Sequence, residues 1–182
     1  MLLLVPLPSA AGDWGLADLM TRLGEVPRYR ATFRETKHLA VLSEPLVQEG
    51  TLLYEAPGHL RKVVTSPHEK IYDIRGDTLT ISSPEEGVRR VDIGDHPLLR
   101  SFVTTLRGIL SGDRAALADS YRLRLEGGAA EWTLRLTPTD PALRERIREV
   151  EVHGSGARIE VVKTVEADGD YSRLAIRQGD GD

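Results

Sequence analysis

A short glycine-serine run is the segment of this chain whose residue types come nearest to those of a hydrolase. A nucleophilic serine needs a base beside it and sits on a sharp turn with the spacing Gly-x-Ser-x-Gly. The run His153-Gly154-Ser155-Gly156 lacks that glycine spacing. Its glycines also miss the third position of a dinucleotide-binding fingerprint and precede a strand rather than a helix. We therefore predict a turn between two strands here.

Metal binding and acid–base chemistry find little support elsewhere. None of the histidines forms an i, i+4 helical pair or another spacing typical of metal ligands. The histidines are His38, His59, His68, His96 and His153. Carboxylates are numerous, but Glu85-Glu86 falls in a predicted turn and Asp168-Gly169-Asp170 in a predicted hairpin. A glycosidase pair is defined by its separation in space, which a sequence leaves open. We expect no metal, no cofactor and a function other than catalysis.

The overall composition is that of one globular domain. Of 182 residues, 40% are hydrophobic and 29% are charged, which suits a soluble protein with a sizeable core. The chain has no cysteine, which excludes a disulfide, a thiolate metal site and a cysteine nucleophile. The net charge of -4 argues against nucleic acid as a partner, because phosphate binding requires an excess of clustered Lys and Arg.

The first twelve residues resemble the end of a secretory signal. An apolar run over residues 1–7 is followed by small residues at Ser9 and Ala11, which suit cleavage, although the charged region that opens such a signal is missing. The alternative is an apolar N-terminal arm. The signal interpretation predicts an exported protein with a single domain over residues 13–178.

The remaining elements follow in a simple order: a helix, about five strands, an apolar helix and about five further strands. Residues 13–26 carry one apolar helical stripe, and Pro27 ends that helix. Residues 37–48 are expected to be a loop or a ragged pair of strands. The predicted strands are 29–34, 50–56, 60–65, 70–74, 78–82, 88–93, 121–125, 132–136, 147–152, 158–165 and 171–178.

The second long helix, over residues 97–110, is apolar around more than half of its circumference. A helix that lies on a sheet with its outer side in water needs less apolar surface than this. Two explanations stay open from the periodicity alone: ordinary packing of a helix on a sheet, or a lid over an apolar ligand. Residues 113–119 predict one further short helix.

An ordered series of segments in the first half of the chain suggests a family. The amphipathic helix is followed by Tyr29–Phe33, then by Val47–Tyr54, by Pro57–Leu60 with its proline turn, by the proline loop of Ser66–Ile71, and by the Gly-Asp hairpin of Asp73–Leu79. In this order residues 13–93 resemble the outer-membrane lipoprotein carrier family, the LolA-like proteins, whereas the second half matches only in the order of its elements.

The resemblance implies an α+β fold. A curved antiparallel sheet of about ten to eleven strands would form an incomplete (half) β-barrel, with its concave face covered by the N-terminal helix and the central lid helix. It also implies a periplasmic monomer that binds acyl chains of a lipoprotein or glycolipid in a lidded cavity. Such a carrier takes its cargo from an inner-membrane exporter and gives it to an outer-membrane acceptor protein.

The expected cavity lining combines apolar residues of the alternating strands with those of the lid helix. These residues are Phe33, Leu52, Tyr54, Leu79, Ile81, Leu99, Phe102, Val103, Leu106, Leu123, Leu125, Trp132, Leu134 and Leu136. One position departs from the family pattern. The arginine that precedes the strand-ending proline and helps to hold the lid closed is here Ala56, and Arg61 is a candidate to take its place.

A second function from a different class stays open. A periplasmic adaptor or sensor would use the same curved sheet to bind a protein partner, with its helices serving only as core and with no lipid cargo. Bound lipid in the purified protein would favour the carrier over the adaptor.

Overall fold

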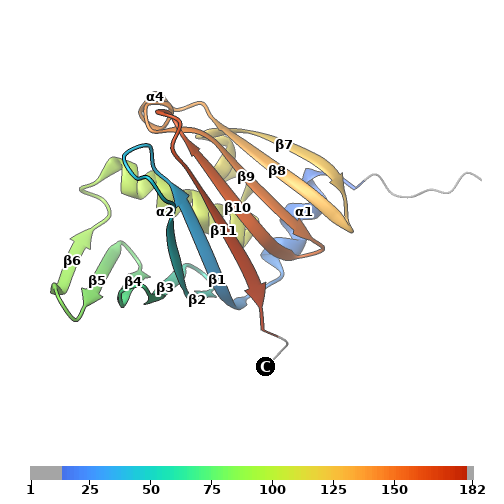
Figure 1. Ribbon diagram of the computed structural model, residues 1–182. Helices are drawn as coiled ribbons and strands as arrows, with labels where there is room; N and C mark the ends of the chain where they lie inside the picture. Colours follow the sequence, from blue (N-terminus) through green and yellow to red (C-terminus); the bar gives the residue numbers. More distant parts are fainter. Residues whose placement is uncertain (1–13, 180–182) are drawn as a thin grey trace, which may run out of the picture.

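The computed structural model describes residues 14–179, which form one open, curved antiparallel sheet with four helices. The predicted secretory signal lies outside the described residues. The strand order is β6-β5-β4-β3-β2-β1-β11-β10-β9-β8-β7, so the first and last strands in sequence are neighbours at the middle of the sheet. Figure 1 shows the curvature, with α1 and α2 on its inner side. The expected half-barrel with covering helices is confirmed.

The first half of the sheet is a meander of six strands that follows α1 (Leu16–Gly24). Its turns contain the predicted glycines and prolines, which explains why the strand limits agree with the alternation. The strands are β1 (Arg28–His38), β2 (Leu46–Glu55), β3 (His59–Ser66), β4 (Lys70–Arg75), β5 (Thr78–Ser83) and β6 (Gly87–Asp92). Residues 37–48 were predicted as a loop or ragged strands. Residues 39–45 form the loop, and the other five residues extend β1 and β2.

The second half begins with the helices and continues as a five-stranded meander. The helices are α2 (Pro97–Ser111), α3 (Arg114–Ala118) and the short α4 (Pro141–Arg144). Of these, only α4 was not predicted from the sequence. The strands are β7 (Tyr121–Gly128), β8 (Glu131–Pro138), β9 (Ile147–Ser155), β10 (Arg158–Glu166) and β11 (Tyr171–Gln178). No helix within residues 14–179 is long and apolar enough to cross a membrane.

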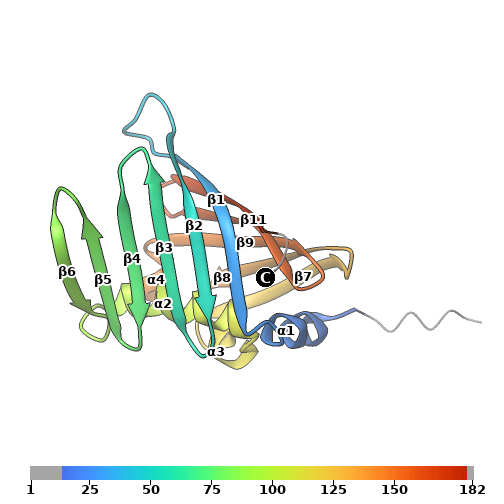
Figure 2. The same cartoon turned by 90° about the horizontal axis from the view of Figure 1, so that it is seen from below.

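Strand register assigns every side chain to one face of the sheet, because successive residues of a strand alternate. In β1, Tyr29, Ala31, Phe33 and Glu35 are buried while the residues between them are exposed. The buried set faces the helices and defines the concave face. Figure 2 shows the two halves of the sheet meeting at β1 and β11, with α2 near one end of the strands and the β1–β2 loop projecting from the opposite end.

Candidate functional site

The concave face carries two separate apolar clusters rather than one continuous core. The first cluster is built on β7–β10 and is covered by α1, α3, α4 and the end of α2. The second is built on β1–β5 and is covered by α2 and by Ile93, which precedes that helix. Among residues 14–179, only Leu110 of α2 and Ile176 of β11 pack against both clusters. These two side chains therefore mark a seam between the clusters.

The structure distributes eleven of the fourteen predicted lining residues over the two clusters and places three outside them. Tyr54, Leu79, Ile81, Leu99, Val103 and Leu106 belong to or pack against the second cluster. Leu123, Leu125, Trp132, Leu134 and Leu136 belong to or pack against the first. Phe33 is buried and Leu52 half-buried on the concave face, outside both clusters. Phe102 is also in neither and is 49% exposed on α2.

The space beneath α2 is filled by these side chains. A cavity of only about 10 Å³ lies at the seam, lined by Leu23, Val26, Tyr29, Tyr54, Leu110, Ala157 and Ile159. This volume is about what one water molecule requires. The Tyr29 hydroxyl donates to the carbonyl of Ile159 at 2.8 Å across the seam, and burial raises the pKa of Tyr29 to about 12. The side chains at the seam therefore leave no room there for an acyl tail.

The helix α2 reaches both clusters with neighbouring stripes of its surface. Leu99, Val103 and Leu106 pack on the second cluster, whereas Ile109 is part of the first. Leu98 and Phe102, which lie on the same side as Ile109 but nearer the start of the helix, are exposed. The apolar circumference noted in the sequence thus has two causes: contact with two clusters, and an apolar edge left open to solvent.

Arg107 connects α2 to the turns of the first half-sheet. Its Nε donates to the carbonyl of Gly58 in the β2–β3 turn at 3.1 Å, and a terminal guanidinium nitrogen donates to the carbonyl of Gly76 in the β4–β5 turn at 2.6 Å. Charged donors make the stronger class of hydrogen bond. We call this pair of bonds the Arg107 latch. A single side chain of the lid helix therefore fastens it to two hairpin turns.

The expectation that Arg61 replaces the missing arginine at Ala56 is wrong. Arg61 pairs in register with Leu53, which lies on the convex face, opposite to the lid. Its Nε is 3.8 Å from the Asp73 carboxylate on that same face. In the Arg107 latch the arginine instead stands on α2, and the turns supply the acceptors. The sequence signal was a basic residue, Arg107, next to the apolar stripe of the helix.

The other end of α2 is held by close backbone packing. Gly112 ends the helix with a positive φ of 66°, and a Cβ placed there would lie 1.9 Å from the backbone oxygen of Met20 in α1. A Cβ on Gly24 would meet the oxygen of Ser111 at 2.7 Å. The Thr105 hydroxyl lies 3.2 Å from the hydroxyl of Tyr121 in β7. The end of α2 is thus fixed to α1 and β7.

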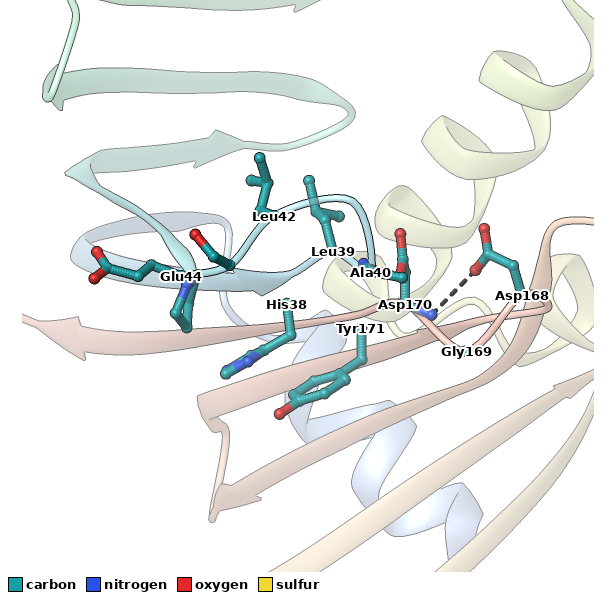
Figure 3. Close-up of a pocket in the computed structure, with 11 residues that line it drawn as sticks. His38, Leu39, Ala40, Leu42, Glu44, Asp168, Gly169, Asp170 and Tyr171 are labelled. Atoms are coloured by element: carbon teal, nitrogen blue, oxygen red, sulfur yellow. Dashed lines mark hydrogen bonds between the residues drawn. The ribbon is translucent and has the colours of Figure 1, made fainter.

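A second cavity lies outside the lid, between the β1–β2 loop and the β10–β11 hairpin. It measures about 330 Å³. The rings of His38 and Tyr171 stack at its floor with centroids 4.3 Å apart, and the Asp170 carboxylate accepts a hydrogen bond from the backbone of Ala40 at 2.7 Å. Figure 3 shows these side chains around the opening. The residues lining this cavity are His38, Leu39, Ala40, Leu42, Ser43, Glu44, Pro45, Asp168, Gly169, Asp170 and Tyr171.

The titratable groups do not form a metal centre within residues 14–179. The ion pairs of the second half lie on the convex face, where Arg135 contacts Glu149, Glu151 and Glu126. Ion pairs also form from the concave face, where Lys37, Lys62 and Lys70 each contact a carboxylate. Lys62 donates to the carboxylate of Glu35 at 2.6 Å, and neither residue was identified from the sequence.

Comparison with known proteins gives a family and a set of similar folds. Residues 9–179 match the family described as "Outer membrane lipoprotein carrier protein LolA-like". No curated protein matches the sequence.

Solved structures are similar to this chain at low sequence identity, and MucB has the same fold. MucB, also solved from Pseudomonas aeruginosa in complex with MucA, has 18% identity and a TM-score of 0.52, with 92% of this chain and 59% of MucB covered. A LolA superfamily protein from Nitrosomonas europaea has 12% identity and a TM-score of 0.47 over 87% of this chain and 90% of that one. Lipoprotein LppX from Mycobacterium tuberculosis has 10% identity and a TM-score of 0.49 over 92% and 96%.

Proposed function

We propose that this chain, which belongs to the outer membrane lipoprotein carrier protein LolA-like family, binds the acyl chains of a lipoprotein or another lipid beneath α2. In this proposal it is a periplasmic carrier between the inner and outer membranes, loaded by an exporter and unloaded by an acceptor. The family description supports the carrier class.

One observation carries the proposal: a single helix closes the seam between two apolar clusters of one concave face. Leu110 of α2 packs against both clusters, and the Arg107 latch ties the helix to the turns of one half-sheet only. Moving α2 would expose apolar side chains of both halves at once. That exposed surface is the hollow that an acyl chain would occupy.

The closed state makes such a carrier reversible. Burying each CH₂ group of a tail is favourable by roughly 0.8 kcal/mol. A cavity that stayed open in the empty protein would therefore bind a lipid too tightly to release it. Here the apolar side chains of α2 fill the hollow of the empty protein. Ligand entry therefore replaces one apolar contact by another, and the net affinity stays moderate. The closed state predominates in the empty protein, and the lipid must shift the population to the open state when it loads.

Phe102→Glu is expected to weaken the binding of a fluorescent fatty-acid analogue by roughly fivefold to tenfold, about 1 to 1.4 kcal/mol, because a charge would enter the apolar mouth of the hollow. Phe102 is 49% exposed in the closed state, so the free energy of unfolding should change by no more than about 0.5 kcal/mol. Equilibrium titration followed by fluorescence measures the affinity, and chemical denaturation measures the stability.

Two further variants frame this result. Val88→Glu adds the same charge at a 65% exposed apolar residue on the convex face of β6 and should leave binding unchanged. Leu106→Glu places the charge in the lid–sheet contact and should weaken both binding and stability. Unaltered uptake in both Phe102→Glu and Leu106→Glu would overturn the lid assignment.

The second candidate function is an adaptor that binds a protein partner on the same curved sheet. It is favoured by the 330 Å³ cavity beside the β1–β2 loop and by Val41 in that loop, which is 88% exposed. Contiguous exposed apolar residues, here Val41 and the 46% exposed Leu42, are a feature of protein-binding surfaces. A chain that takes up no fatty-acid analogue, even with the lid loosened, would favour the adaptor.

A further inference from the structure

The charged residues of the concave face are almost all basic, although the chain as a whole is acidic. Register places four basic residues on this face of the first half-sheet and one acidic residue. The basic residues are Lys37, Lys62, Lys70 and Arg89, and the acidic one is Glu35. The whole chain has a net charge of -4. The concave face of the first half-sheet, which we call the basic wall, therefore has a net charge of the opposite sign to that of the whole chain.

The second half-sheet provides the contrast. The concave positions that β8 shares with β7 and β9 are all uncharged. They are occupied by Tyr121, Leu123, Leu125, Gly127, Trp132, Leu134, Leu136, Pro138, Val150, Val152 and Gly154. At the positions compared, charge on the concave side thus belongs to the first half-sheet.

Glu35, Lys62 and Lys37 form the centre of the basic wall, and we call them the Lys62 cluster. The Glu35 carboxylate is 2.6 Å from the ammonium of Lys62 and 3.7 Å from that of Lys37. Two cations share one anion, so the cluster keeps one positive charge unmatched. The Lys62 ammonium also lies 4.8 Å from the centre of the Phe33 ring.

The Lys62 cluster is partly withdrawn from water without being sealed. The side chains of Glu35, Lys62 and Lys37 are 11%, 26% and 34% exposed. Burial lowers the pKa of Lys62, and Glu35 counteracts that shift. Electrostatic interactions are stronger at such a site than on an open surface, because less water screens them. A second anion would therefore be held better here than by an exposed lysine.

The position of the Lys62 cluster relative to α2 determines how a bound amphiphile would lie. Leu60 packs in the cluster covered by α2, and Lys62 follows two residues further along the same face of β3. At the rise of a strand this is about 6 to 7 Å beyond the lid-covered row, toward the end of the sheet that α2 leaves open. An acyl tail beneath α2 would bring its polar end to this level.

We infer that the Lys62 cluster binds the anionic headgroup, a phosphate or carboxylate, of the amphiphile whose acyl tail lies beneath α2. This inference rests on the proposed carrier function and adds to it the sign of the charge on the cargo. The headgroup would accept hydrogen bonds from the Lys62 and Lys37 ammonium groups and share them with Glu35. The ligand class is an acidic lipid rather than a neutral one.

Competition against an uncharged fluorescent acyl probe tests this inference in the full chain. The competitors are dodecyl phosphate, dodecanoate and dodecanol, which share one tail and differ in the headgroup. The wild type should prefer each anion to the alcohol by about tenfold. Dodecyl phosphate and dodecanoate in separate arms distinguish a phosphate from a carboxylate source.

The variants assign the preference to the cluster. Lys62→Met should reduce the ratio of anion affinity to dodecanol affinity to near one, while the affinity for dodecanol itself stays within about twofold of the wild type. Glu35→Gln should increase this ratio because a competing anion is lost. Since Lys62→Met leaves Glu35 paired with Lys37, the double variant Lys37→Met with Lys62→Met removes both cations of the cluster and should show at least the same loss. Lys163→Met, on the convex face, is the matched control and should bind as the wild type does.

The outcomes separate this inference from the carrier function. Equal binding of anions and alcohol by the wild type, or an anion preference that survives in the double variant, overturns the anionic headgroup and leaves the carrier standing. A wild type that binds neither probe nor competitor overturns the carrier, and the headgroup site with it.

Discussion

Replacing Arg107 with alanine is expected to raise the affinity for a fluorescent fatty-acid analogue by about 10- to 100-fold. The latch contributes two hydrogen bonds from a charged donor to the closed state. Bonds of this kind contribute about 1.5 to 3 kcal/mol, and we assign that value to the partly exposed pair together. The open fraction should rise by the corresponding factor. Apparent affinity rises with it, because only the open state accepts the tail.

Matched variants identify the cause. Arg100→Ala removes the same charge from an exposed position of the same helix and should leave the affinity unchanged. Arg107→Lys keeps the charge but cannot span two carbonyls with a planar fork, so it should behave more like alanine than like the wild type. The same affinity in wild type and Arg107→Ala would contradict a closed state that limits uptake. A faster release of lipid to acceptor vesicles would contradict it as well.

Gly112→Ala is expected to lower the free energy of unfolding by roughly 2 to 5 kcal/mol. The positive φ of 66° costs a residue with a Cβ roughly 1 to 2 kcal/mol. The new Cβ would also lie 1.9 Å from the Met20 oxygen, and overpacking of this kind typically costs a further 1 to 3 kcal/mol. Urea denaturation gives the value directly. The loss would show that the end of α2 is fixed by contact with α1.

Gly76→Ala is the matched control for backbone conformation. Gly76 has a similar φ of 54°, but a Cβ there meets nothing within 4 Å. Its substitution should cost only the roughly 1 to 2 kcal/mol of the strained backbone. Equal losses in the two variants would mean that the contact between α1 and α2 contributes nothing, and that the lid has no fixed end.

The strands were predictable because local signals set them. Alternation from Tyr29 onward and the glycine and proline turns fix the strand limits within a few residues, and neither requires knowledge of distant contacts. The half-barrel itself came from the resemblance, since alternation does not reveal that β1 pairs with β11. The four-residue α4 was not predicted because it is too short to show helical periodicity. Its sequence does contain a cap at Asp140 and a first-turn proline at Pro141.

The site was predictable only in its apolar part. Alternation identifies residues such as Leu134 and Leu136 as facing inward, but not that they join a different cluster from Tyr54. The latch was missed because Arg107 bonds to carbonyls 49 and 31 residues away, which no local pattern encodes. The Lys62 cluster left a usable signal. Glu35 and Lys62 occupy inward positions of alternating strands, where a charge needs a partner or a ligand.

The most direct test of the central claim is to extract the protein itself. The full chain, purified from the periplasm of a double-membraned bacterium without detergent, would be examined by native mass spectrometry before and after organic extraction. A carrier predicts about one bound acyl lipid per chain, which extraction removes and tandem mass spectrometry identifies. A protein that carries no lipid, and that takes up none when a fatty-acid analogue is offered to Arg107→Ala, would contradict the claim that α2 covers a lipid-binding hollow.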